Sequence, residues 1–180
     1  MTTTDPSTIV LNPARLVALL AGIVAVAVLF GTPAARSSTA DHCATTRLEV
    51  SVTRITGATS HRFWDIAVKN RAAQACHVRG YPGIGLLNRR GALIAVNVSR
   101  VRGGVTQAID LVPGARAYFT FAYTEGGPCG SHTFKAYGLQ ITPPDEYSHL
   151  VIRRPAFTVC ATSVGGAPTV YPLRRQIGSR

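Results

Sequence analysis

The sequence predicts an all-β protein, an antiparallel β-sandwich preceded by one N-terminal apolar helix. Three observations carry this prediction. An uncharged apolar run stands near the start of the 180-residue chain, hydrophobic and polar residues alternate along much of the remainder, and turn sequences separate short apolar runs. Alternation with a period of two is typical of strands with one buried face, and many short strands without intervening helices favour a sandwich.

The apolar run extends from Leu16 to Gly31 and follows Arg15 directly. As a helix it would be roughly 24 Å long, near the lower limit for crossing a hydrocarbon core of ~30 Å. We therefore expect residues 16–31 to be a signal anchor that leaves residues 1–15 in the cytoplasm. The alternative is a signal peptide that is cleaved among the small residues downstream. A lipid anchor is not expected, because Asp41 and His42 precede Cys43 where a lipobox requires a small residue.

All four cysteines, Cys43, Cys76, Cys129 and Cys160, follow the apolar run. An even number of cysteines behind a membrane-targeting segment indicates a domain in an oxidising compartment, where disulfides persist. Four cysteines allow three pairings, and all three remain open on the sequence. The spacing favours Cys43 with Cys76 and Cys129 with Cys160, since each of these pairs closes a loop of about 30 residues.

The alternation is clearest in residues 48–53, 64–69 and 115–123. In the second segment Trp64 and Ile66 are expected to face the core, and Asp65 the solvent. Six shorter apolar runs bring the expected set to about eight to ten strands. They are residues 84–87, 93–98, 107–111, 137–141, 150–152 and 157–160.

Composition sets the expected boundaries of the folded part. Residues 32–42 are small and polar with one proline, as in a linker, and the sandwich is expected over residues 43–164. Residues 165–180 contain glycine and proline without alternation and are expected to form a flexible basic tail.

The formal net charge is +11, and it comes from 17 arginines and two lysines against eight acidic residues. A GC-rich genome would produce this arginine bias by mutation alone. The functional alternative is attraction to an anionic envelope polymer, anionic headgroups or an acidic protein. Nucleic acid is not an expected partner, because the domain is placed outside the cytoplasm and no recognition motif is present. The doublets Arg89-Arg90, Arg153-Arg154 and Arg174-Arg175 are expected in turns or on solvated edges.

No catalytic residue, metal ligand or cofactor is predicted. Cys129 and His132 stand three residues apart, as a thiol nucleophile and its base could, but structural disulfides account for the cysteines more simply. His42-Cys43 and Cys76-His77 are adjacent pairs whose side chains point to opposite faces of a strand, so neither doublet chelates well. The remaining histidines, His61, His132 and His149, fall in expected turns.

The residues also resemble a known family. Glu49, the Gly80-Tyr81-Pro82-Gly83 turn at a fixed distance after Cys76, the Pro113-Gly114 turn and the Leu139-Gln140-Ile141-Thr142-Pro143-Pro144 segment are similar to domain-of-unknown-function family 4232, an actinobacterial extracytoplasmic family. The likeness covers about residues 43–168. It implies an immunoglobulin-like sandwich in the cell envelope and carries over no catalytic residue.

The expected function is therefore that of a noncatalytic module outside the cytoplasm, anchored in the membrane or secreted after cleavage. Its expected partner is an envelope protein or an anionic envelope polymer, and the sequence identifies no ligand-binding residues. The alternatives are an extracytoplasmic enzyme that uses Cys129 and His132, and a metal-binding protein that uses histidines.

Overall fold

A computed structural model describes residues 40–125, 129, 132–160 and 166–177. The described part consists of ten β-strands and one short 3-10 helix, Thr45–Arg47. The prediction of an all-β protein is therefore confirmed. Residues 16–31, expected to form the apolar helix, lie outside the described residues. Among the residues that are described, no helix has the length and hydrophobicity needed to span a membrane.

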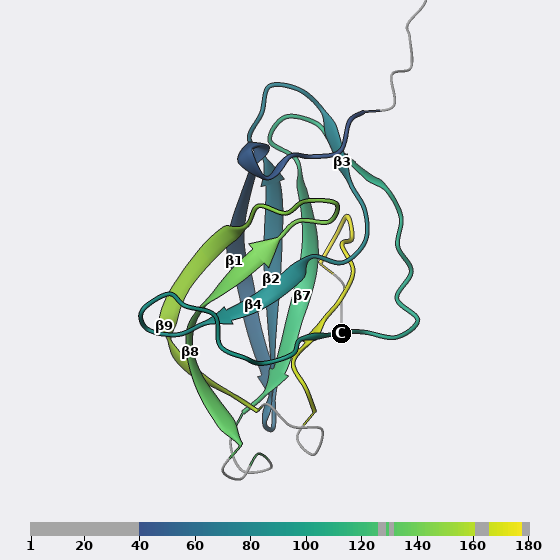
Figure 1. Cartoon of the computed structure of the whole chain (residues 1–180). Coiled ribbons are helices and arrows are strands. Elements are labelled where there is room, and N and C mark those ends of the chain that lie inside the picture. Colours follow the sequence, from purple (N-terminus) through teal and green to yellow (C-terminus); the bar gives the residue numbers. More distant parts are fainter. Residues whose placement is uncertain (1–39, 126–128, 130–131, 161–165, 178–180) are drawn as a thin grey trace, which may run out of the picture. The chain divides into compact units, whose positions relative to one another are not determined.

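Two sheets form the body of the domain (Figure 1). The first sheet has the strand order β1-β2-β7-β10-β5, and the second has the order β4-β8-β9. A separate antiparallel pair joins β3 to β6. The strand bounds are β1 Leu48–Ala58, β2 His61–Asn70, β3 Cys76–Val78, β4 Gly83–Leu87, β5 Ser99–Arg100, β6 Ile109–Leu111, β7 Arg116–Thr124, β8 Thr133–Thr142, β9 Leu150–Cys160 and β10 Thr169–Val170.

The core lies between the two sheets and follows the alternation in the sequence. Phe119 and Phe121 of β7 are fully buried, as is Ile66 of β2, and the opposite sheet contributes its own buried side chains. Trp64 is 3% exposed, with its ring centroid 4.7 Å from that of Phe157 on β9. Burying one large apolar side chain contributes about 1.5–3 kcal/mol, so these inward positions supply much of the stability. The buried residues of the second sheet are Leu86, Ala136, Leu139, Ile141 and Val159.

Two of the expected strands differ from the prediction. Residues 93–98 do not form a strand. Leu93 makes only an isolated bridge to Leu87, and the ladder ends where the Val96 N–H donates back to the Ile94 carbonyl. The runs 150–152 and 157–160 belong to one strand, β9, which contains Pro155. Proline is tolerated there because β9 is an edge strand with a neighbour on one side only. The N–H that proline lacks is therefore not needed for pairing on the open side of the strand.

The expectation of a flexible tail over residues 165–180 is wrong for residues 166–177. β10 pairs antiparallel with β7 and parallel with β5, so it is an inner strand of the first sheet. Val170 and Leu173 are 2% and 3% exposed. Two apolar residues are too few to show a period of two, yet their burial and the backbone bonds of β10 hold the segment in the sheet. The domain therefore extends beyond residue 164.

The start of the domain also lies slightly earlier than expected. His42 forms a parallel bridge with His77, and the His77 N–H donates to the Asp41 carbonyl over 2.8 Å. Residues 40–42, assigned to the linker from their composition, are thus joined to β3. The remaining linker residues, 32–39, lie outside the described part.

The Gly80-Tyr81-Pro82-Gly83 turn connects three parts of the chain. The Gly80 carbonyl accepts a bond from the Leu173 N–H over 2.8 Å, and the Tyr81 hydroxyl donates to the Val101 carbonyl over 3.0 Å. The φ angle of Gly80 is +103°, a backbone conformation that favours glycine. A side chain at Gly104 would overlap the Tyr81 hydroxyl. The turn therefore holds both the C-terminal segment and the loop after β5.

Candidate functional site

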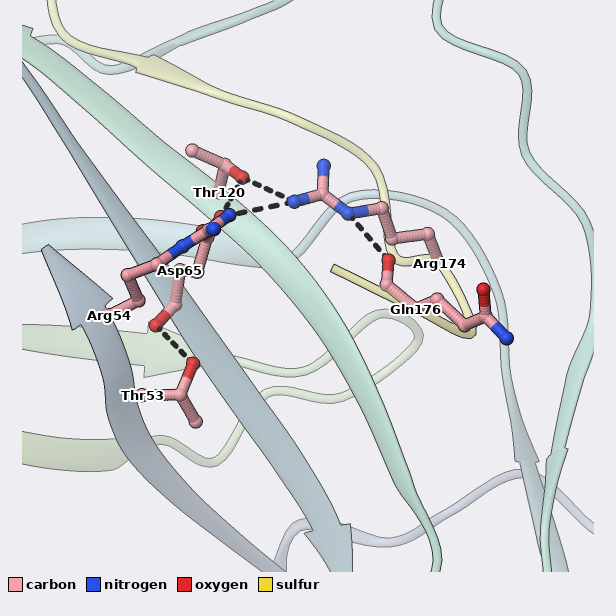
Figure 2. Close-up of polar contacts among 6 residues, drawn as sticks. All are labelled: Thr53, Arg54, Asp65, Thr120, Arg174 and Gln176. Carbon is pink, nitrogen blue, oxygen red and sulfur yellow. Dashed lines mark hydrogen bonds and ion pairs between the residues drawn. The ribbon is translucent and has the colours of Figure 1, made fainter. Parts of the chain in front are cut away.

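The most connected polar site in the described part surrounds the carboxylate of Asp65, on the outer face of the first sheet (Figure 2). Its Oδ2 accepts from Arg54 at 2.9 Å from Nε and 2.7 Å from Nη2. Its Oδ1 accepts from the Thr120 hydroxyl at 2.6 Å and from Arg174 Nη2 at 3.0 Å. The Asp65 side chain is 1% exposed. We refer to these four residues, Arg54, Asp65, Thr120 and Arg174, as the Asp65 cluster.

Local structure explains how four distant positions meet. Asp65 lies directly opposite Thr120 on β7, and a register shift between Val52 and Arg54 places Arg54 opposite Asp65 on β1. This irregularity also leaves Thr53 free to donate its hydroxyl to the Asp65 carbonyl over 2.9 Å. A β-bulge of this kind redirects side chains on the bulged strand. Arg174 arrives from the C-terminal segment, which bridges to β7 at Tyr118.

The prediction that Asp65 faces solvent is wrong, and so is the expectation that Arg174 lies in a turn or on a solvated edge. The alternation placed Asp65 correctly on the face opposite the core, but Arg174 and Arg54 cover that face. The one feature of the sequence that indicated a buried Asp65 is its position in the middle of a strand, between apolar neighbours. Such a group needs a buried partner, because an unpaired charge is costly to bury.

The geometry of the Asp65 cluster favours a structural role. Both carboxylate oxygens already accept bonds from guanidinium or hydroxyl donors, so neither is presented to a substrate. The cluster links β1, β2 and β7 to the C-terminal segment. Charge-assisted bonds are roughly twice as strong as neutral ones, so this linkage fixes the C-terminal segment on the sheet.

A second acidic site lies at Glu146, between β8 and β9. The Thr45 hydroxyl and the Thr45 N–H donate to its Oε2 at 2.6 and 2.9 Å, and His42 Nε2 lies 2.8 Å from its Oε1. The hydroxyl bond of Thr45, then its backbone bond and then the His42 bond lower the pKa of Glu146 from 4.5 to about 2. The carboxylate therefore joins the start of the domain to the loop after β8.

Replacing Glu146 by glutamine is expected to reduce stability in a pH-dependent way. Because the folded state lowers this pKa, the stabilisation is fully present above pH 4.5 and is lost as the pH falls toward 2. We expect Glu146→Gln to lower the free energy of unfolding by about 1–2 kcal/mol at pH 7, and the difference from wild type to shrink at pH 3. Urea unfolding at both pH values measures this. Asp145→Asn is the matched control, since asparagine tolerates the positive φ of that position, and an equal loss in both variants would contradict the role of Glu146.

The four cysteines form the two pairs that the spacing favoured. Cys43 is bonded to Cys76, with 4.9 Å between their Cα atoms, and Cys129 is bonded to Cys160, with a Cα separation of 5.3 Å. The sulfur of Cys129 is therefore not available as a thiolate. The His132 N–H donates to the Cys129 carbonyl over 3.1 Å. This arrangement supplies no nucleophile to the alternative of a cysteine enzyme.

The histidines are spread over the domain. His42 contacts Glu146, the His77 ring contacts the Ala40 carbonyl, and His61 Nδ1 lies 3.2 Å from the Thr124 hydroxyl. His132 and His149 are exposed. Within the part of the chain that is described, no three histidine, cysteine or acidic side chains gather as metal ligands would. The geometry adds no support to the metal-binding alternative.

Two grooves in the described part of the domain are lined partly by the C-terminal segment. The larger, about 420 Å³, has Phe63 of β2, Ala122 of β7 and Tyr171 among its lining residues. The smaller, about 300 Å³, is lined by Val105, Gln107 and Ile109 and by residues 173–175. Arg174 of the Asp65 cluster is among the lining residues of the smaller groove.

The remaining candidate is the cationic surface. In the described part, the arginines within ion-pair distance of a carboxylate are Arg54, Arg62, Arg71 and Arg174. Their partners, Asp65, Glu125 and Glu49, leave few acidic groups for the other described arginines. Most guanidinium groups of the domain therefore have no carboxylate partner among the described residues.

The comparison with known families gives one match. A family model described as "Domain of unknown function (DUF4232)" matches residues 43–174. Neither a curated protein nor a solved structure matches the chain. The matched range ends at Arg174, so it includes β10 and every member of the Asp65 cluster.

Proposed function

This chain belongs to the DUF4232 family of domains of unknown function, and from that premise we propose that it is a noncatalytic binding module that acts outside the cytoplasm and recognises an anionic envelope polymer. The family is described as one of unknown function and so indicates no ligand or reaction. The proposal therefore depends on the charges of this chain. The observation that carries it is the set of guanidinium groups without a carboxylate partner in the described part of the domain.

The charge distribution supports binding to a polyanion. Ordinary protein surfaces intersperse both signs, and a surface of one sign attracts counterions and charged polymers. Here acidic residues are used at the Asp65 cluster, at Glu146 and at Arg62, where they join parts of the fold. Arg100 and Arg154 lie over the rings of Tyr81 and Trp64, and the remaining arginines stay available to a partner. The net charge of +11 has the sign that an anionic polymer requires.

The disulfides support a location outside the cytoplasm. Bonds between Cys43 and Cys76 and between Cys129 and Cys160 persist in oxidising compartments and are rare in reducing ones. With the apolar run at residues 16–31, they favour an exported domain that is anchored in the membrane or released by cleavage. The facing sheets, with Trp64 packed between them, are consistent with the proposed immunoglobulin-like arrangement.

Salt dependence tests the proposed function. The full chain, held in a nonionic detergent, is titrated with polyphosphate and with polyglutamate at 50 and 500 mM salt. Binding that weakens at least tenfold at the higher salt supports electrostatic recognition of a polymer, because counterion release makes such binding steeply salt-dependent. Absence of binding at 50 mM salt, or binding that salt does not change, overturns it.

A further inference from the structure

We propose that Arg89, Arg90 and Arg153 form one phosphate-recognition site, which we call the arginine tip. This inference rests on the proposed function and deepens it, because it names the site and the chemical class of the polymer. Arg89 and Arg90 stand in the turn after β4, and Arg153 lies on β9, more than sixty positions later in the sequence. The sequence predicted only separate doublets in turns or on edges.

The fold brings these three arginines together through Gly91. A Cβ built at Gly91 would lie 2.5 Å from Arg153 Nη2 and 3.3 Å from Arg153 Cζ and Nη1. The guanidinium of Arg153 therefore lies against the backbone of the turn that carries Arg89 and Arg90. The φ angle of Gly91 is +88°, so glycine serves both the turn and the close approach of Arg153.

The turn holds its two arginines in a defined place. The Asn88 side-chain oxygen accepts from the N–H groups of Arg90 and Ala92 at 2.9 and 3.1 Å, and the Gly91 N–H donates to the Asn88 carbonyl over 3.0 Å. The Leu93 side chain packs on Gly85 of β4, which fixes the turn on the second sheet. Binding to a fixed turn loses less conformational entropy than binding to a mobile one.

The arginine tip has an electrostatic cost that an anion would remove. Like charges on neighbouring positions repel, and no carboxylate of the described part lies within ion-pair distance of Arg89, Arg90 or Arg153. The chain places its acidic groups at other arginines instead. Guanidinium groups match phosphate oxygens with paired donors, and several of them around one anion are typical of phosphate recognition. The ligand class is therefore a polymer that carries phosphate groups.

Two pairs of variants of the full chain test the arginine tip, with polyphosphate as the probe at 50 mM salt. Arg89→Gln, Arg90→Gln and Arg153→Gln combined should weaken binding at least tenfold and lower the slope of log affinity against log salt by about 2, since each phosphate contact on a flexible polyanion contributes roughly 0.7. Arg79→Gln, Arg102→Gln and Arg116→Gln combined remove the same charge from exposed positions elsewhere and should weaken binding about twofold. Circular dichroism confirms that both variants are folded.

The second pair changes no charge. Gly91→Ala displaces the Arg153 guanidinium and should weaken polyphosphate binding about threefold or more. Gly114→Ala carries the same kind of backbone strain, at a φ of +80° with nothing within 4 Å of the new Cβ, and should leave binding unchanged. A loss in Gly91→Ala alone assigns the effect to geometry rather than to net charge.

The outcomes separate the arginine tip from the proposed function. If wild type binds polyphosphate but both triple variants weaken equally, the arginine tip is wrong and the binding module stands. If wild type binds polyglutamate as tightly as polyphosphate, the phosphate class is wrong. If wild type binds neither polymer, the proposed function fails, and the arginine tip fails with it.

Discussion

Replacing Asp65 by alanine is expected to lower the free energy of unfolding by about 3 kcal/mol. Removing one partner from a buried charged cluster leaves the others without compensation, and such losses are typically ~3–5 kcal/mol. The lower end applies here because the Arg54 and Arg174 side chains are 44% and 29% exposed and regain water once the carboxylate is gone. The Thr120 hydroxyl, fully buried, loses its acceptor.

Urea unfolding of wild type and of single and double variants measures this effect. Arg174→Gln should cost less than Asp65→Ala, because Asp65 keeps Arg54 and Thr120. The two substitutions should couple by about 1–3 kcal/mol in a double-mutant cycle, as expected for residues in one network. Lys69→Gln, on the same strand outside the Asp65 cluster, is the control. A loss below ~1 kcal/mol in Asp65→Ala, or additive effects of Asp65 and Arg174, would contradict the linkage to the C-terminal segment.

The alternation of side chains predicted the inner faces of the long strands. Trp64 and Ile66 were expected to face the core, and both are buried, as are Phe119 and Phe121 in the alternating segment 115–123. The pattern works here because a one-residue change of register would move a whole set of apolar residues to the solvent. The inward faces of β2 and β7 are therefore determined by local sequence, and so is the all-β class.

The outer face of the first sheet was not predictable in the same way. Asp65 is buried by Arg174, which lies 109 positions later in the sequence, and by Arg54, which faces it only because β1 contains an irregularity. Neither the irregularity nor the position of β10 leaves a periodic signal. Partners at such separations meet through topology, which alternation along one segment does not encode.

The arginine tip shows the same limit at the candidate binding surface. The sequence displays the doublets Arg89-Arg90 and Arg153-Arg154 as equivalent features, but the fold places Arg153 over Gly91 and Arg154 over the Trp64 ring, at 5.6 Å from its centroid. One arginine of the second doublet thus joins the exposed turn, and its neighbour covers the core. Gly91 was the only local indication, as a glycine that follows two charged residues in a turn.

Removing either disulfide is expected to have the second large effect. Under the chain-entropy model, closing a loop of this length stabilises a domain by about 3–4 kcal/mol, so Cys43→Ala with Cys76→Ala should lower the free energy of unfolding by that amount. Cys129→Ala with Cys160→Ala should lower it by about the same amount, because the two closed loops are nearly equal in length. The bonded residues are 33 positions apart for Cys43 and Cys76 and 31 for Cys129 and Cys160. Urea unfolding of the oxidised variants measures both losses, and wild type in reductant should lose more than either variant.

The near equality of the two loops makes the comparison informative. If the unfolded chain alone determines the effect, the two double variants lose equal stability. The Cys43 bond has additional support in the folded state, since the Cys43 N–H donates to the His77 carbonyl over 2.9 Å and Glu146 holds Thr45 two residues later. Those bonds keep the start of the domain in place after the disulfide is removed, so the loss at Cys43 and Cys76 should not exceed the loss at Cys129 and Cys160. A clearly larger loss at Cys43 and Cys76 would contradict this support. Combining Cys43→Ala and Cys76→Ala with Glu146→Gln should then cost more than the sum of the separate changes, and a strictly additive result would contradict that interpretation.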